Sequence, residues 1–442
     1  MSTAPNTILP QHSTASRPCA VAAAQPSGRG IQVVRGDGCH IVTSDGRRLL
    51  DLTSGMATLN LGHGHPEILQ ALSLQAAELM HAGGAYAHGP IAALAERLAA
   101  IVPAGISSFC FASSGSEAVE GALRVARAAT GRTGVVAFRG GYHGRTLGAA
   151  ACTTSQPRPA TQPDVAAVAV ASFPRPGEWN MDPADAADLA LADLDALHRD
   201  RLTPTETACY VVEPIQGHGG CHPAGRHFLE GLRERADRHG ALLVFDEVQT
   251  GLGRAGDWTA AAVYGVTPDV IALGKALGGG LPLSAFGAAP QVMAALGDGG
   301  HGSTFGGSPL SCAVGLEALR ISERDGLPAR AALLGERAYK RLGDLVRRHP
   351  NLGELRGVGL MLGLTVLDPG TMAPRGDLAL DLALALEDEG VYALCSGPEG
   401  SVLRLLPPLT ISDTEWAYAL EAVERAATLV LPVRATPFVQ AA

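Results

Sequence analysis

The fold is decided by two stretches, Leu242-Leu-Val-Phe-Asp-Glu-Val-Gln-Thr-Gly251 and Asp269-Val-Ile-Ala-Leu-Gly-Lys-Ala-Leu-Gly-Gly-Gly280. Each is a short apolar run that ends at one charged residue, Asp246 or Lys275, and then breaks into glycine. This pattern predicts two buried strands of a parallel sheet, each of which presents a functional group at its carboxyl end.

Lys275 and Asp246 together suggest a chemistry. A lysine walled by apolar side chains loses hydration, so its neutral amine becomes easier to reach at neutral pH and can attack a carbonyl to form a Schiff base. A buried carboxylate could keep a pyridine nitrogen protonated, and such a pair is typical of pyridoxal phosphate (PLP) enzymes. The ordinary alternative is a lysine that reaches solvent from a strand end and an aspartate that caps the next turn.

Short apolar runs alternate with helical patterns as far as residue 288, as in a mostly parallel sheet covered by helices on both faces. Beyond residue 312 the pattern changes to mixed helices and strands, which indicates a second domain. We predict an α/β fold in which a large domain contains a mostly parallel seven-stranded sheet and a smaller domain is α+β. The seven runs are 109–112, 134–138, 168–172, 208–213, 242–246, 270–274 and 284–288.

The predicted organisation has four segments. They are a flexible tail (1–30), a segment that packs with the small domain (31–64), the large domain (65–312) and the small domain (313–442). Residues 1–30 contain no acidic residue, a bias that transit peptides share. Because no amphipathic face is evident, we prefer the interpretation of a loose tail. The other predicted elements are a hairpin (31–52), an acidic, solvent-facing helix (181–201), a long helical stretch (312–348), a strand (357–366), a helix (376–389), strands (391–395 and 402–406) and a closing helix (412–429).

Composition excludes several function classes. The net charge of −9 and the lack of a basic stripe argue against nucleic acid as a partner, and no apolar stretch approaches the roughly 20 residues of a membrane helix. Eight scattered cysteines without a CxxC pair predict free thiols in a reducing compartment, the cytoplasm. His63 and His65 lie two residues apart without a later HxxxH, so no metal site is expected.

The segment 109–118 (Phe-Cys-Phe-Ala-Ser-Ser-Gly-Ser-Glu-Ala) reads as a strand, a tight turn and a helix start. Ser114 and Glu117 have the spacing of a capping box, and free backbone N–H groups at such a start form a seat for a phosphate. An ordinary capped helix remains the alternative. In Phe138-Arg-Gly-Gly-Tyr-His-Gly-Arg-Thr146, Tyr142 could lie flat against a planar cofactor and Arg145 could bind a carboxylate from the same cleft; a surface loop with a solvated Arg145 is the competing interpretation.

These motifs occur in one order, SSGSEA, GGYHGRT, VVEPIQG, LLVFDEVQTGLGR, DVIALGKALGGGLPLSA, GSTFGGSPLSCAVGLEAL and VLRLLPPLTIS, between about residues 36 and 427. The chain thereby closely resembles the class III (ω-amino acid) aminotransferases, which are fold type I PLP enzymes. It looks most like 4-aminobutyrate aminotransferases, with ornithine, acetylornithine and diaminobutyrate aminotransferases as near relatives.

The resemblance implies a role for each cofactor residue. Lys275 matches the lysine that binds PLP covalently and moves the substrate proton, and Asp246 matches the carboxylate at the pyridine nitrogen. The other expected cofactor contacts come from the ring-packing, phosphate-binding and neighbouring-subunit positions: Ser114, Gly115, Ser116, Tyr142, His143, Glu213, Val248, Gln249 and, from the second subunit of a homodimer, Thr304.

For the substrate, the resemblance implies that Arg404 binds the α-carboxylate and that Glu213 pairs with Arg404 when a terminal amine is bound. Met56 and Arg145 are expected to line the same pocket. His218 stands where a glutamate is common in the family, and the stretch around Tyr86 and His88 also departs from 4-aminobutyrate enzymes, which leaves the donor open.

The expected function is transfer of a terminal amino group from an ω-amino acid or a diamine to 2-oxoglutarate. An amino-acid epimerase or racemase on the same scaffold would use the same Lys275 and Asp246 and stays an alternative. A non-catalytic PLP-binding protein would not need both residues.

Overall fold

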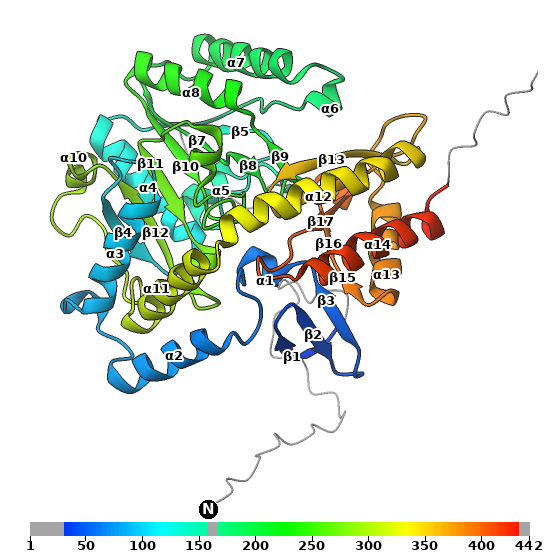
Figure 1. The fold of residues 1–442 in the computed structure, drawn as a ribbon. Helices are drawn as coiled ribbons and strands as arrows, with labels where there is room; N and C mark the ends of the chain where they lie inside the picture. Colours follow the sequence, from blue (N-terminus) through cyan, green and yellow to red (C-terminus); the bar gives the residue numbers. More distant parts are fainter. Residues whose placement is uncertain (1–30, 158–166, 433–442) are drawn as a thin grey trace, which may run out of the picture.

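A seven-stranded sheet forms the centre of the computed structural model, which describes residues 31–157 and 167–432 (Figure 1). The predicted tail over 1–30 lies outside the described residues. The strand order is β4-β12-β11-β10-β7-β5-β6, and only β12 runs antiparallel to its neighbours. The predicted sheet is therefore confirmed. Its strands are β4 (Ser108–Ala112), β5 (Gly134–Phe138), β6 (Val168–Ala171), β7 (Thr207–Val212), β10 (Leu242–Asp246), β11 (Val270–Leu273) and β12 (Ser284–Ala288).

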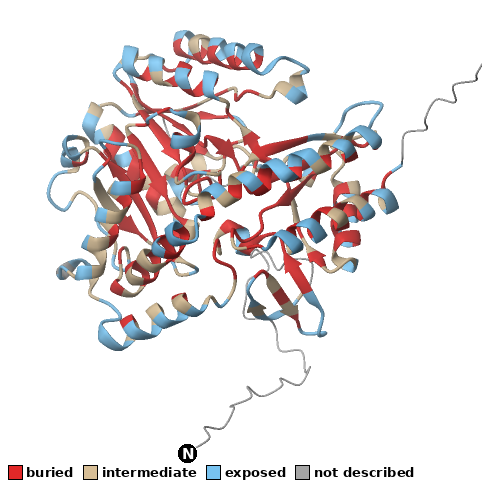
Figure 2. Ribbon diagram, in the orientation of Figure 1, coloured by how far each residue is buried: buried red, intermediate tan, exposed pale blue. Residues whose placement is uncertain are grey.

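Helices cover both faces of this sheet. Along β10, Leu243 and Phe245 pack with α7 (Pro183–Asp200) and α8 (Arg226–His239), whereas Val244 packs with α4 (Gly115–Thr130). Because successive side chains of a strand point to opposite faces, a strand buried on both sides must be apolar throughout. Figure 2 shows these strands buried between helices whose outer sides are exposed.

The C-terminal part is built on a four-stranded antiparallel sheet, β13-β14-β17-β16. The predicted single strand over 357–366 is wrong, because Gly359 turns the chain with φ 59° and makes β13 and β14 a hairpin. The predicted strand over 391–395 is likewise divided between two sheets. The strands are β13 (Leu352–Val358), β14 (Met361–Val366), β15 (Val391–Tyr392), β16 (Leu394–Ser396) and β17 (Val402–Leu405).

The long helical stretch predicted over 312–348 is two helices, α11 (Pro309–Arg324) and α12 (Leu327–Arg348). Gly326 adopts φ 61°, a left-handed conformation that suits glycine and interrupts a helix, and Pro328 lies in the first turn of α12, where its missing N–H is harmless. Helices α12, α13 (Gly376–Asp388) and α14 (Asp413–Val430) share one hydrophobic core with the C-terminal sheet.

The predicted N-terminal hairpin is confirmed as three antiparallel strands, β1 (Val33–Asp37), β2 (His40–Thr43) and β3 (Arg48–Asp51). Strand β15 adds to it in parallel, so segments from the N-terminal and C-terminal parts of the chain share a sheet. The four-segment domain division stays a prediction, and α11 runs across its boundary at residue 312.

The acidic helix predicted over 181–201 is α7, but its charges do more than face solvent. Asp195 forms an ion pair with Arg235 of α8 at 2.6 Å, and Asp193 accepts a hydrogen bond from the Ser172 amide. Ala190, Leu194 and their neighbours bury the opposite face against the sheet. The remaining elements are α1 (Ser54–Ala57), α2 (Pro66–Glu78), α3 (Gly89–Ile101), α5 (Leu147–Cys152), α6 (Pro176–Trp179), α9 (Ala260–Tyr264), α10 (Pro290–Met293), the short strands β8 (Ile215–Gln216) and β9 (His222–Pro223), and the 3-10 turns η1 (Gly83–Ala85), η2 (Lys275–Gly278), η3 (Ala294–Leu296) and η4 (Pro398–Gly400).

Within the described ranges, no helix is long and apolar enough to cross a bilayer. No disulfide joins any of the seven cysteines in those ranges. Nε2 of His63 donates a hydrogen bond to Oδ2 of Asp51 at 2.9 Å, and the described residues contain no cluster of three or more His, Cys, Asp or Glu side chains that could hold a metal ion.

Candidate active site

A cavity of about 440 Å³ lies at the carboxyl ends of β7, β10 and β11 and is closed from the other side by β17. Strand ends at this edge of a parallel sheet converge, which is why residues far apart in the chain meet here. The structure brings together most of the predicted site residues. The lining consists of Met56, Gly115, Ser116, Tyr142, His143, Gly144, Arg145, Gln156, Glu213, His218, Asp246, Val248, Gln249, Lys275 and Arg404.

Lys275 lies two residues after the end of β11, beyond Gly274, and starts η2 with a left-handed backbone, φ 46°. This conformation strains the backbone of a residue other than glycine. Folded proteins retain such strain mainly at sites where it orients a functional side chain. Burial lowers the pKa of Lys275 to about 8, and the negative charges of Glu213 and Asp246 only partly oppose it. A substantial fraction of this amine is therefore neutral near physiological pH.

Asp246, the last residue of β10, is fixed on both carboxylate oxygens. Oδ2 is 2.8 Å from Nδ1 of His143, and Oδ1 accepts a hydrogen bond from the Val248 amide. Burial alone would lower the pKa of His143, but the hydrogen bond and charge of Asp246, helped by Glu213, raise it above its ordinary value. The pair therefore presents an oriented, anionic carboxylate to the cavity.

The turn between β4 and α4 forms the predicted capped helix start, and its role as a phosphate seat stays a prediction. The Ser114 hydroxyl caps α4 by accepting a hydrogen bond from the Glu117 amide, and the Glu117 carboxylate accepts hydrogen bonds from the amides of Ser113 and Ser114. Gly115 and Ser116 then turn the start of a 16-residue helix toward the cavity, where the helix dipole favours an anion.

Glu213 follows β7 and is bound by backbone rather than by a cation. Its two oxygens accept hydrogen bonds from the amides of Tyr142, at 2.7 Å, and Gly217, at 2.9 Å. Burial raises the pKa of Glu213 to about 7, against the lowering effect of His143. No ion pair joins Glu213 to Arg404 among the described residues, and their pairing in the presence of a terminal amine stays a prediction.

Arg404 lies on β17 and is only 4% exposed. Its Nε is buried without a hydrogen-bond partner, and burial lowers the pKa of its guanidinium. Arg145, by contrast, is exposed at the cavity mouth.

Sequence reasoning missed Gln156 and gave His218 no role. The His218 ring stacks on Tyr142, with ring centres 5.1 Å apart, and its Nε2 lies 2.9 Å from Nε2 of Gln156. Gln156 follows α5 in a loop that carries no recognisable motif, so nothing in the sequence marked it.

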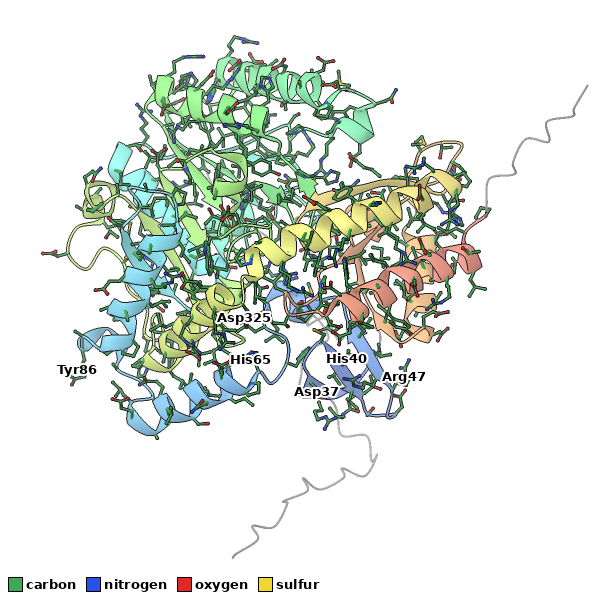
Figure 3. All side chains as sticks on the ribbon, in the orientation of Figure 1. Asp37, His40, Arg47, His65, Tyr86 and Asp325 are labelled. Carbon is green, nitrogen blue, oxygen red and sulfur yellow. The ribbon has the colours of Figure 1, made fainter. Side chains whose placement is uncertain are left out.

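Four predicted residues do not line the cavity of their own chain. Ser114 acts as the helix cap, and Thr304 is exposed on the loop before α11. Tyr86 is 74% exposed at the outer end of the molecule (Figure 3), and His88 caps α3.

The residues of the cavity fit PLP. Oε1 of Gln249 and Nε of Arg404 are buried polar atoms without partners, as expected where a polar ligand supplies them. A Cβ on Gly115 would lie 2.7 Å from Cγ1 of Val248, so the phosphate seat and the predicted ring-packing residue are in close contact. Lys275 and Asp246 open into the same space.

Fold and cavity together define a fold type I PLP enzyme. Comparisons with known proteins identify the family within this class. The model of the class-III aminotransferase family matches residues 22–427. The acetylornithine aminotransferase of Archaeoglobus fulgidus is 36% identical over 88% of this chain and 94% of its own. The 4-aminobutyrate aminotransferase of Escherichia coli is 34% identical over 88% and 92%.

Among solved structures, the PLP-bound amine transaminase from an uncultivated Pseudomonas species is 31% identical, with a TM-score of 0.86 over 95% of this chain and 99% of its own. The chain belongs to the class III aminotransferases. The resemblance inferred from its motifs is thus confirmed, as is PLP as the cofactor.

Proposed function

We propose that this aminotransferase moves a terminal amino group from an ω-amino acid or a diamine, of the 4-aminobutyrate or ornithine and diaminobutyrate kind, to 2-oxoglutarate, giving glutamate and an aldehyde. The observation that carries the proposal is a buried arginine, Arg404, in one cavity with Lys275 and Asp246. Support also comes from relatives named for acetylornithine, 5-aminovalerate and 4-aminobutyrate, each of which has an amine at the end of a carbon chain.

PLP, when bound, supplies an electron sink that stabilises negative charge on the substrate carbon next to nitrogen. The residues of the chain do the rest. Asp246, oriented by His143, would hold the proton on the pyridine nitrogen, and Gly115 and Ser116 would bind the phosphate. Lys275, with its lowered pKa, takes a proton from the substrate carbon and returns it.

Arg404 would bind a substrate carboxylate, and Arg145 could bind the second carboxylate of 2-oxoglutarate from the cavity mouth. A guanidinium recognises a carboxylate through two parallel hydrogen bonds, which positions the reacting carbon as well as attracting the charge.

We further propose a cytoplasmic homodimer in which Thr304 of each subunit reaches the phosphate of the other. Thr304 is exposed, and the next residue, Phe305, is 65% exposed, with its ring 5.1 Å from that of His81, which follows the 60% exposed Met80. Such side chains are typical of a covered interface. The free thiols support a reducing location. A monomer by sedimentation in the presence of PLP would contradict the dimer.

The test is glutamate formation from 2-oxoglutarate with purified holoenzyme and a panel of donors: 4-aminobutyrate, 5-aminovalerate, ornithine, acetylornithine and 2,4-diaminobutyrate. Glutamate with at least one donor is the expected result. Exchange of the α-proton of L-amino acids in D₂O without glutamate would contradict the proposal and favour the epimerase.

A further inference from the structure

A second cavity, of about 430 Å³, borders the loops that carry Tyr142 and His218 but is separate from the active site. Within the described ranges, the two cavities share no lining residue. Cavities that stay empty in proteins are apolar, whereas a cavity with charged walls requires a polar occupant. The walls of this one combine cationic, polar and aromatic side chains, those of Arg139, Arg175, Ser155, Glu178, Phe173 and Trp179.

Arg175 is the most deeply buried cation of this cavity, with a side chain that is 11% exposed. Nη2 donates a hydrogen bond to Oε1 of Gln216 at 2.6 Å, and the guanidinium lies 5.6 Å from the centre of the Phe173 ring. Nη1 is buried and has no hydrogen-bond partner among the residues that the structure describes. A buried N–H group of a cation is costly to leave unpaired, so Nη1 requires an acceptor.

The charges around Arg175 do not balance. Among the described lining residues, Glu178 is the one carboxylate; it is 47% exposed and its Oε1 comes only to 3.6 Å from Nη1. A second buried guanidinium, that of Arg356, has Glu354 at 3.9 Å. Burial lowers the pKa of Arg175 to about 10; the charge of Glu178 opposes this and the charge of Arg356 adds to it. With Arg139, three guanidiniums therefore face two half-exposed carboxylates, and the region attracts an anion.

Two further groups of the cavity suit an organic anion. Oγ of Ser155 is buried without a hydrogen-bond partner in the described part of the chain, and a hydroxyl can donate to a carboxylate or a phosphate. Phe173 and Trp179 add apolar surface to the same cavity. A few polar groups beside aromatic side chains are the usual composition of a small-molecule site.

Arg175 also links this cavity to the active-site loops. Gln216, which accepts from Arg175, donates through Nε2 to the Arg139 carbonyl at 2.9 Å. The amide of the next residue, Gly217, donates to Glu213 at 2.9 Å. A ligand of Arg175 would thus contact the guanidinium that holds the loop beside Glu213.

We propose that this cavity is a binding site for a small organic anion, separate from the substrate site, in which a carboxylate or phosphate group of the ligand pairs with Nη1 of Arg175. The Ser155 hydroxyl donates a second hydrogen bond, and the exposed Arg139 attracts the anion to the cavity. The inference does not depend on the proposed donor or acceptor of the aminotransferase.

The experiment titrates benzoate and phenyl phosphate, with uncharged benzyl alcohol as the control, into PLP-loaded wild type and Arg404→Gln. The Arg404→Gln protein lacks the guanidinium that would bind a probe in the active site. Of the three tryptophans, Trp179 lines this cavity, whereas Trp258 and Trp416 pack in other hydrophobic clusters, so tryptophan fluorescence reports local binding. We expect a saturable change with at least one anion in both proteins, and none with benzyl alcohol. Trp179→Phe should abolish the signal, while calorimetry still detects binding.

Two variants should move the affinity in opposite directions. Arg175→Gln removes the charge that pairs with the anion and should weaken binding roughly 10- to 100-fold, the size of a charge-assisted hydrogen bond. Glu178→Gln removes the competing carboxylate and should strengthen binding roughly 2- to 5-fold, the size of a half-exposed ion pair. If Arg175→Gln does not fold, Glu178→Gln still tests the charge argument, because Glu178 is half exposed.

Opposite shifts in these two variants support the site, and the probe that binds more tightly identifies the preferred anionic group. The proposal is overturned if neither anion changes the fluorescence of Arg404→Gln, or if benzyl alcohol binds equally well. Unchanged affinity in folded Arg175→Gln and Glu178→Gln also overturns it, because the anion then binds elsewhere. Failure of the donor panel to give glutamate would contradict the proposed function alone, since none of these titrations requires turnover.

Discussion

When the pH is raised from 6 to 10, the amine of Lys275 in the PLP-free protein should lose its proton about 2.5 pH units below an ordinary lysine. With a pKa of about 8, roughly one molecule in eleven has a neutral Lys275 amine at pH 7 and roughly ten in eleven at pH 9. At the ordinary value of 10.5 the neutral fraction at pH 7 is only about one in 3,000, so burial increases it roughly 300-fold.

The assay uses the unusual composition of the chain, which contains only two lysines, Lys275 and Lys340. A small acetylating reagent reacts with the neutral amine, and mass spectrometry of the digested protein reports both sites in one sample. Lys340 is exposed on α12 and serves as the internal comparison. The Lys275 rate should rise about tenfold per pH unit below pH 8 and flatten above it.

The charges around Lys275 set the direction of two further shifts. Glu213 is the strongest charge that raises the pKa of Lys275, so Glu213→Gln should move the midpoint to lower pH; Arg404 lowers it, so Arg404→Gln should move the midpoint up. A Lys275 rate that keeps rising tenfold per unit up to pH 10 would refute the reasoning, because burial would then not control this amine.

Three further predictions concern catalysis and stability. Lys275→Ala should still bind PLP non-covalently, seen by absorbance, but lose glutamate formation; retained turnover would contradict the assignment. Gly121→Ala should lower the melting temperature, because a Cβ there would lie 2.1 Å from Cε1 of Phe286 and overpacking costs about 1–3 kcal/mol, more than the roughly 1 kcal/mol that alanine gains in a helix. Tyr210→Phe should also lower the melting temperature, since the Tyr210 hydroxyl lies 2.8 Å from Nε2 of buried His198 and its loss leaves that ring nitrogen without a partner, at a cost of about 1–3 kcal/mol; an unchanged melting curve in either variant would contradict the corresponding prediction.

The sequence predicted the central sheet well because its strands are buried on both faces. A continuous apolar run such as 242–246 predicts a buried strand when turn residues and helical patterns flank it. Asp246 and Lys275 were identifiable for the same reason, since a charge at the end of such a run has no structural need to be there.

Side-chain partners were harder to predict than strands. The resemblance implied a pairing of Glu213 with Arg404 when a terminal amine is bound, but it did not reveal that the Tyr142 amide donates a hydrogen bond to Glu213, because spacing along a strand does not show which backbone group will come close. The break between α11 and α12 could have been predicted from the sequence, because Asp325-Gly326 followed by Pro328 is a signal for the end of one helix and the start of the next. Gln156 carried no signal at all.

The pairing of β3 with β15 joins strands about 340 residues apart in the chain. At a synthesis rate of roughly 5–20 residues per second, β3 leaves the ribosome roughly 17–70 s before its partner exists. Throughout that interval the N-terminal sheet has an open edge, to which other extended segments can add. The strands made first are thus among the last to be fully paired, because the edge of β3 stays open until β15 has been made.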